Sequence, residues 1–262
     1  LKKYGKVYHS PHSYNNKFGV PLSLANLKSN TDYGIFEIGM DKKGEIDYLS
    51  KIVKPELAII TNISEAHFKN FDTLKDIAKA KSEIINNITK GGNIILNKDS
   101  KFYHFLSNKA KKKDINVISF GTKKKSDIFL LNIKKIKNYY KLKIIIKGKI
   151  FYFDTKYSTN NYVNNILACI SAMYVLNLNL NKMKKIFIGF HIPEGRGDFK
   201  RVMKFNKKFD FIDESYNANP LSMISAISNM NFYKRKKNQR KFIFLGDMLE
   251  LGKKSRKLHK SL

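Results

Sequence analysis

The first candidate for a chemical role in this sequence is a lysine that lies among apolar residues. Residues 72–88 place apolar side chains at the i, i+3, i+4, i+7 spacing of one helix face. The residues that form this stripe, apart from the lysine, are Leu74, Ile77, Ala78, Ile84, Ile85 and Ile88. Lys81 falls on the same stripe. A buried ammonium is costly unless it is paired, chemically modified or directed into a polar cavity, whereas a lysine at the edge of the stripe could extend its amine into solvent. The pattern alone leaves both explanations open.

Polar side chains also stand where predicted strands end. The residues in this position are Glu37, Asn62, Asp213 and Asp247. In open parallel sheets ligands bind outside the carboxyl ends of the strands, so these residues outline a crevice, although each could instead form a turn or a helix cap. His67 follows the strand of Asn62 after one short loop and is expected over the same crevice as Glu37. A carboxylate and an imidazole there could share a divalent cation with phosphate oxygens, and an ordinary loop histidine is the alternative.

A second group of candidate residues lies near the end of the chain. Asn219 followed by Pro220 predicts a helix start, with the asparagine as its cap. Polar groups just before it would lie near the positive end of the helix dipole, where they suit a nucleotide. Capping alone accounts for Asn219 but not for Tyr216 and Asn217. Arg196 lies between two glycines, and a guanidinium there suits a phosphate clamp that acts on domain closure.

An alternation of short apolar runs with stretches of helical period predicts the elements that position these residues. It is typical of parallel strands joined by crossover helices, so we expect an α/β fold with a mostly parallel central sheet flanked by helices. Strands are predicted over residues 33–39, 56–62, 93–97 and 116–121. Helices are predicted near residues 44–53, 72–88, 99–111, 161–176 and 181–189. Residues 140–155 depart from this rhythm and predict a small antiparallel addition.

The string HIPEGRGD, at residues 191–198, predicts a domain boundary because it gathers proline, glycine and charge between a helix and a strand. We therefore expect one domain over residues 1–190 and a second α/β domain over residues 191–262. The second would contain two strands within residues 198–215, a helix from Pro220 to about Asn231, a strand over 241–247 and the start of one more helix.

The chain has 51 lysines and arginines against 21 acids, which gives a formal net charge of +30. Such a charge invites a nucleic-acid-binding function. Only five of the basic residues are arginines, whose forked side chains base readers favour, and no aromatic residues interleave with the lysine runs. We therefore interpret the lysines as solvated surface and expect no nucleic-acid partner. A basic nucleic-acid-binding protein remains the alternative from a different functional class.

The single cysteine, Cys169, lies in the apolar string NILACISAMYVL. We expect a core residue in a reducing compartment, without a disulfide or a paired-thiol metal site. No apolar run approaches the roughly 20 residues of a membrane span, and residues 1–10 lack the apolar stretch of a signal peptide. The sequence therefore predicts a cytoplasmic protein without membrane insertion.

A series of strings, in this order, resembles the Mur ligases, and among them the branch that adds D-alanyl-D-alanine to UDP-N-acetylmuramoyl-tripeptide. The strings, spread over residues 15–252, are NNKFGVPLSL, FEIGMDKKGEI, ITNISEAHF, IAKAKSEI, NILA, IPEGR, DESYNANPLSM and LGDMLELG. The resemblance implies a monomeric, Mg²⁺-dependent enzyme of peptidoglycan precursor synthesis, which uses ATP to form an acyl phosphate and then an amide. It also implies a P-loop-type central domain followed by the start of a Rossmann-like C-terminal domain.

The resemblance assigns a role to each candidate side chain. Glu37 and His67 would hold magnesium ions, and Lys81 would be carbamylated and join the metal site as a catalytic residue together with His67. Arg196 would reach the γ-phosphate of ATP. The residues expected on the adenine and ribose side are Asp213, Tyr216, Asn217, Asn219 and Asn161. Asn15 and Asn16 would lie near the muramoyl-peptide substrate. Asn161 stands where the family has a histidine, and Tyr162 where it has an asparagine, so the contacts with the base are expected to differ there.

The chain also departs from the family pattern. It lacks the Gly-rich phosphate-binding loop that ends in Gly-Lys-Thr/Ser and normally precedes the NNKFGVP segment. We expect that loop and the uridine-nucleotide domain upstream of Leu1, and the rest of the C-terminal domain beyond Leu262. This chain alone is therefore predicted to be inactive. Another Mur or folylpolyglutamate-type amide ligase is the nearest alternative function, and a noncatalytic Mur-like scaffold is a third.

Overall fold

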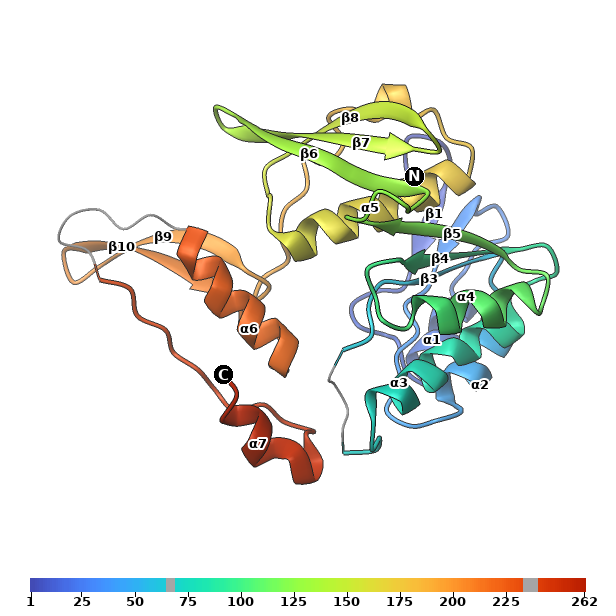
Figure 1. Ribbon diagram of the computed structural model, residues 1–262, viewed down its shortest axis with the longest axis horizontal. Coiled ribbons are helices and arrows are strands. Elements are labelled where there is room, and N and C mark those ends of the chain that lie inside the picture. The colour runs from blue at the N-terminus through green and yellow to red at the C-terminus, as the bar shows by residue number, and fades with distance from the viewer. Residues whose placement is uncertain (65–68, 233–239) are drawn as a thin grey trace. The chain divides into compact units, whose positions relative to one another are not determined.

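The computed structural model describes residues 1–64, 69–232 and 240–262 (Figure 1). The chain divides into two compact units. The first unit consists of Leu1–Ile63 and Thr73–Gly189, and the second consists of Ser64–Asp72 and Phe190–Leu262. In the described residues, no helix is long and apolar enough to cross a membrane.

A six-stranded sheet forms the centre of the first unit (Figure 1). Its strands, in spatial order, are β3 (Leu57–Ile60), β4 (Asn93–Asn97), β5 (Asn116–Gly121), β6 (Ile128–Ile136), β7 (Tyr139–Ile146) and β8 (Lys149–Thr155). The pairs from β3 to β6 are parallel, and those from β6 to β8 are antiparallel. This confirms the predicted α/β class with a mostly parallel sheet, and the predicted antiparallel addition. The two-residue turn Lys147–Gly148 has φ angles of 45° and 81°, which match the right-handed twist of a tight hairpin.

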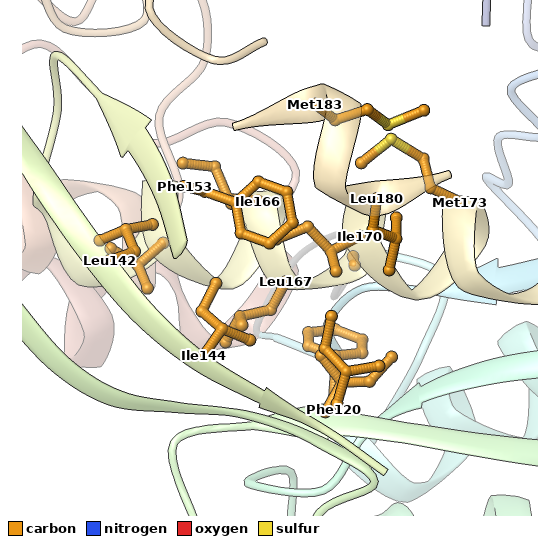
Figure 2. Close-up of a cluster of buried hydrophobic side chains, with 14 of the residues drawn as sticks. Phe120, Leu142, Ile144, Phe153, Ile166, Leu167, Ile170, Met173, Leu180 and Met183 are labelled. Carbon is orange, nitrogen blue, oxygen red and sulfur yellow. The ribbon is translucent and has the colours of Figure 1, made fainter. Parts of the chain in front are cut away.

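Helices cover both faces of the parallel strands (Figure 1). α4 (Tyr103–Lys111) packs against β4 and β5 on one face, and α5 (Asn160–Val175) packs against β4, β5 and β6 on the other. Because both faces are covered, the sequences of the central strands are continuous apolar runs. Residues 94–96 of β4 accordingly have no exposed surface. Figure 2 shows the resulting core, in which Phe120 of β5 and Phe153 of β8 lie among the apolar side chains of α5.

The predicted helix over 72–88 forms in two pieces. Thr73 caps α3 (Leu74–Lys81) by accepting a hydrogen bond from the Asp76 backbone N–H, and the chain continues as a 3₁₀ helix, η1 (Ser82–Asn87). The apolar stripe is buried in part or in full along both pieces, and Lys75 and Lys79 lie exposed off it. The stripe packs η1 against α2 (Glu45–Val53).

A small parallel sheet and one helix complete the part of the first unit that carries the candidate site. β1 (Val7–His9) pairs with β2 (Tyr33–Ile35), and α1 (Gly19–Ala25) lies between them in sequence. The sequence did not predict β1. The predicted strand over 33–39 ends at Ile35, so Glu37 lies two residues beyond it.

Two expectations for the first unit are wrong. The predicted helix over 181–189 is only a 3₁₀ turn, η2 (Leu180–Met183), because the following residues run along the free edge of β8. There the Lys184 carbonyl accepts a hydrogen bond from the Asp154 N–H, and Phe187 forms a β-bridge with Thr155. Cys169 is exposed rather than in the core, since it lies on the face of α5 that points away from the core cluster.

In the second unit, β9 (Asp198–Lys204) and β10 (Lys207–Asp213) form an antiparallel hairpin. Its helical elements are α6 (Pro220–Asn229), η3 (Met230–Phe232), η4 (Gly252–Lys254) and α7 (Ser255–His259). The predicted strand over 241–247 is wrong: these residues form no regular structure. β9 and β10 pair only with each other, so the described residues of this unit offer the segment no neighbouring strand for its backbone hydrogen bonds.

Candidate active site

Asn15 and Glu37, 22 residues apart in sequence, meet through a direct hydrogen bond in the first unit. Asn15 Nδ2 donates to Glu37 Oε1 at 2.9 Å, and the Gly39 N–H donates to the Asn15 carbonyl at 2.7 Å. A side chain at position 39 would bring its Cβ within 2.9 Å of Asn15 Cγ. The segment after β2 therefore lies directly against Asn15, and glycine at position 39 permits this close approach.

Lys81 is the last residue of α3 and is half-buried. Burial lowers the pKa of the Lys81 amine, and the negative charge of Glu37 opposes that shift. None of the described residues forms a hydrogen bond with Lys81 Nζ. The amine is thus partly withdrawn from water, within the electrostatic reach of Glu37. Lys81, Glu37 and Asn15 come from three separate segments and form the candidate site of the first unit.

Carboxylate oxygens are the ligands that Mg²⁺ prefers in proteins. Glu37 fits such a role because Asn15 engages only its Oε1 among the described residues. His67, the predicted second ligand, lies outside the described residues. Within the described part of the chain, no group of three or more His, Cys, Asp or Glu residues could hold a metal ion. The described residues alone therefore supply one carboxylate that could bind a metal and one half-buried amine.

Of three further candidates in the first unit, Asn16 and Asn62 make local contacts and Asn161 lies on the surface. Asn16 Oδ1 accepts hydrogen bonds from the N–H groups of Phe18 at 3.0 Å and Gly19 at 2.9 Å, which fixes the start of α1. Asn62 Oδ1 accepts the N–H of Ile63 at 2.8 Å, as a turn former does. Asn161 is the second residue of α5 and is exposed. Its neighbour Tyr162 packs its ring against Tyr157, with centroids 4.8 Å apart.

In the second unit, the Arg196 loop is joined to the segment after β10. Arg196 Cζ lies 3.9 Å from the centre of the Tyr216 ring, a cation–π contact. The Tyr216 N–H donates to the Gly195 carbonyl at 2.9 Å. Gly195 has a φ of 72°, and a Cβ there would lie 2.9 Å from the Tyr216 nitrogen. Only glycine suits that position, and the backbone contact holds the guanidinium over the ring.

The remaining candidates in the second unit surround the start of α6. Hydrogen bonding from Ser215 holds the pKa of Asp213 below its ordinary value. Asn219 caps α6 through a reciprocal box with Ser222: Asn219 Oδ1 accepts the Ser222 N–H at 2.9 Å, and Ser222 Oγ accepts the Asn219 N–H at 3.0 Å. Asn217 is exposed, and Asp247 has a side chain that is 91% exposed.

Sequence patterns assigned no role to Glu83, two residues after Lys81, or to Lys109, which contacts Ser82. Glu83 accepts backbone hydrogen bonds at the start of α2, and Lys109 donates to Ser82. The only signal for Glu83 is an acid two positions after the lysine of the apolar stripe, and Lys109 stands within a lysine run without any distinguishing pattern.

A family model of the Mur ligase middle domain matches residues 1–173. The chain belongs to the Mur ligase family. A relative from Rickettsia prowazekii (strain Madrid E), the UDP-N-acetylmuramoyl-tripeptide--D-alanyl-D-alanine ligase, is 32% identical to this Mur ligase chain over 257 residues, which cover 98% of this chain and 56% of the relative. The chain thus spans about half the length of the curated relatives it matches.

Solved Mur ligase structures share the fold of this chain. A crystal structure of MurF from Acinetobacter baumannii has a TM-score of 0.87 and 29% identity, and the match covers 99% of this Mur ligase chain and 55% of that one. The MurF ligase of Thermotoga maritima in complex with ADP has a TM-score of 0.83, 23% identity, and coverage of 100% and 58%. At that identity the second likeness supports the fold alone.

Proposed function

We propose that this chain is part of an ATP-dependent ligase that joins D-alanyl-D-alanine to UDP-N-acetylmuramoyl-tripeptide in peptidoglycan precursor synthesis. The observation that carries the proposal is the half-buried Lys81 within reach of the Glu37 charge, in a member of the Mur ligase family. The name of the Rickettsia prowazekii relative supports the choice of substrates. We assign residues 1–190 to the central domain and residues 191–262 to the start of the C-terminal domain.

The proposed reaction has two steps. The tripeptide carboxylate attacks the γ-phosphorus of ATP and ADP leaves, which gives an acyl phosphate. The free amine of D-alanyl-D-alanine then adds to the acyl carbon and loses a proton, and inorganic phosphate leaves as the amide forms. Little covalent chemistry falls to the protein, so its contribution is to position the substrates and to neutralise charge.

Lys81 would act in its carbamylated form. Because burial lowers the pKa of its amine, a larger fraction is neutral, and the neutral amine is the form that adds to carbon dioxide. The adduct releases a proton and becomes a carbamate anion, which removes the cost of keeping an ammonium half-buried. Glu37, His67 and carbamylated Lys81 would hold Mg²⁺, which when bound neutralises charge on the phosphate oxygens. Asn15 would keep the Glu37 carboxylate oriented.

Arg196 would bind the terminal phosphate of ATP. Its guanidinium rests on the Tyr216 ring, so the group is pre-organised while its N–H donors point from the edge of the plane. Membership of the Mur ligase family supports a nucleotide as the ligand. Asp213, Asn217 and Asn219 would then lie on the adenine and ribose side, with Asn161 of α5 as a further contact. Asn15 and Asn16 would adjoin the muramoyl peptide.

The test uses the protein produced from the complete coding region. We expect phosphate release from ATP that requires Mg²⁺, UDP-N-acetylmuramoyl-tripeptide and D-alanyl-D-alanine together, with the pentapeptide product found by mass spectrometry. Lys81→Met is expected to lower kcat about a hundredfold or more. Lys79→Met is the matched control, because Lys79 lies on the same helix but is exposed. Phosphate release that responds instead to a single amino acid or to glutamate would indicate another Mur or folylpolyglutamate-type ligase.

The same preparation also tests the proposed oligomeric state of the enzyme and the proposal that it has no nucleic-acid partner. We propose a cytoplasmic monomer with no nucleic-acid partner, and the monomer is checked by sedimentation. Salt-dependent DNA binding that outcompetes ATP, and that is unchanged by Glu37→Gln, would favour the alternative suggested by the charge of +30.

A further inference from the structure

Glu83 connects the segment that bears Lys81 to the loop that follows Glu37. The Gly44 N–H donates to both oxygens of Glu83, at 2.9 and 3.0 Å, and the Asp47 N–H donates to Glu83 Oε2 at 3.3 Å. Gly44 is the N-cap of α2 and, as a glycine, has no side chain that could cap the helix. The Glu83 carboxylate supplies the missing acceptors, from a residue 39 positions away.

Lys109 of α4 holds the residue between Lys81 and Glu83. Its Nζ donates to the Ser82 carbonyl at 2.9 Å and to Ser82 Oγ at 3.0 Å. Burial lowers the pKa of the Lys109 amine, and the charges of Glu83 and Asp47 oppose that shift. Ser82 is 1% exposed, so these are contacts of the interior. The Lys109 ammonium and the Glu83 carboxylate are both charged, and hydrogen bonds of charged groups are stronger than those of neutral groups. These bonds join the segment after Lys81 to two different elements, α4 and the start of α2.

These contacts fix the backbone immediately after Lys81. Ser82 is held to α4, and Glu83 is held to the start of α2, whose chain leads back through seven residues to Glu37. Lys81 itself has no hydrogen bond to any described residue, so its position depends on the backbone that carries it. We propose that Glu83 and Lys109 are positioning residues that hold the backbone carrying Lys81 and so keep its amine partly buried. The role of these contacts in catalysis rests on the proposed function, whereas their effect on the position of Lys81 does not.

A purely structural role for Glu83, as the cap of α2, is the competing explanation. Glu45 offers a matched control because it is a second carboxylate at the same helix start. Glu45 Oε2 accepts the N–H groups of Asp41 at 2.5 Å and Lys42 at 2.9 Å, and among the described residues it forms no hydrogen bond with the Lys81 segment. Glu45→Gln therefore weakens the same end of α2 while leaving the anchoring of Ser82 and Glu83 in place.

The first measurement does not need enzyme activity. The product of the complete coding region, in buffer freed of carbon dioxide, is treated with an amine-acylating reagent, and modification at each lysine is followed by peptide mass spectrometry. Glu83→Gln and Lys109→Met are each expected to raise the rate at Lys81 about fivefold relative to the exposed Lys75 and Lys79, since each loses an anchoring hydrogen bond. Glu45→Gln should leave that ratio at the wild-type value. A folded Glu83→Gln or Lys109→Met variant with the wild-type ratio would overturn the proposal.

The second measurement tests the consequence for the metal site. In the ligation assay, Glu83→Gln is expected to raise the Mg²⁺ concentration for half-maximal activity about tenfold, the size of effect seen for groups that orient a ligand. Glu45→Gln should leave that Mg²⁺ concentration at the wild-type value, even where it lowers Tm as much as Glu83→Gln does. Equal Mg²⁺ requirements in the two variants would show that Glu83 acts only as the cap of α2. If the wild-type protein shows no ligation at all, the proposed function fails, while the acylation ratios still decide whether Glu83 and Lys109 position Lys81.

Discussion

The guanidinium of Arg196 lies over the Tyr216 ring, with Cζ 3.9 Å from the ring centre. Both residues belong to the second unit, and the backbone bond from the Tyr216 N–H to the Gly195 carbonyl fixes their separation. An arginine held in this way loses less conformational freedom when it binds a phosphate than one that extends freely into solvent.

This relationship predicts the effect of removing the ring. Tyr216→Ala should raise the KM for ATP about twofold to fivefold, because an exposed cation–π contact is worth roughly 0.5–1 kcal/mol. Tyr216→Phe keeps the ring and should leave KM near the wild-type value. Initial rates of phosphate release at varied ATP concentration check both. A phenylalanine variant as impaired as the alanine variant would show that the hydroxyl, rather than the ring face, matters.

The cap of α6 predicts a separate effect on stability. Asn219→Ala removes the acceptor for the Ser222 N–H and should destabilise the second unit by about 1 kcal/mol, the usual value of a lost N-cap. Asn219→Asp retains the acceptor and places a negative charge at the positive end of the helix dipole, so it should preserve stability. Thermal unfolding followed by circular dichroism measures the difference. Equal stability of all three proteins would contradict the capping role.

The Asp127–Lys147 ion pair predicts a pH dependence of stability in the first unit. Burial raises the pKa of Asp127, but hydrogen bonds from Lys147 and Ser119 outweigh it, and the net pKa lies below the ordinary value. Lys147 Nζ is 2.6 Å from Asp127 Oδ1. A carboxylate with a lowered pKa in the folded state stabilises the protein above its unfolded pKa of about 3.9, and this contribution is lost as the pH falls through the folded value.

Asp127→Asn should therefore lower the free energy of unfolding by about 1 kcal/mol at pH 7 and by much less near pH 2–3. Urea unfolding of the wild type and the variant at both pH values gives the comparison. Lys147→Met should show the same trend, because it removes the other partner. A difference that is constant with pH would mean that the carboxylate contributes through packing and not through its charge.

Much of the fold could be predicted because local patterns and tertiary packing agree. The apolar run of β4 is buried on both faces, so its predicted and observed limits coincide. The predictions fail where a neighbour decides the outcome. Residues 184–187 have helical character in sequence but pair with the free edge of β8, and residues 241–247 have strand character but find no strand beside them among the described residues.

The candidate site, too, could be predicted from local patterns only in part. The apolar stripe of residues 74–88 was enough to single out Lys81, because one charged residue on a buried helix face breaks a regular pattern. The bond between Asn15 and Glu37 could not be predicted from spacing, since it joins segments on either side of α1. The anchoring of Glu83 at Gly44 depends on a contact 39 residues away, which no local pattern encodes.

The close approach of Gly39 to Asn15 gives the sharpest test of the site in the first unit. Gly39→Ala would place a Cβ 2.9 Å from Asn15 Cγ and 3.0 Å from its Oδ1, closer than a Cβ normally packs against another side chain, so the Asn15 side chain must move. That movement breaks the 2.9 Å bond from Asn15 Nδ2 to Glu37 Oε1 and frees the carboxylate to rotate. We expect kcat to fall about tenfold or more, as when a group that orients a metal ligand is removed.

Gly189→Ala is the control for Gly39→Ala, because a Cβ at position 189 meets no atom within 4 Å. It should retain activity and stability. Asn15→Ala, which removes the partner of Glu37 without adding bulk, should reproduce the loss caused by Gly39→Ala, and combining the two should cost little more than either, since both act through one hydrogen bond. Losses that instead multiply in the double variant would mean that Gly39 acts on the site by a route independent of Asn15.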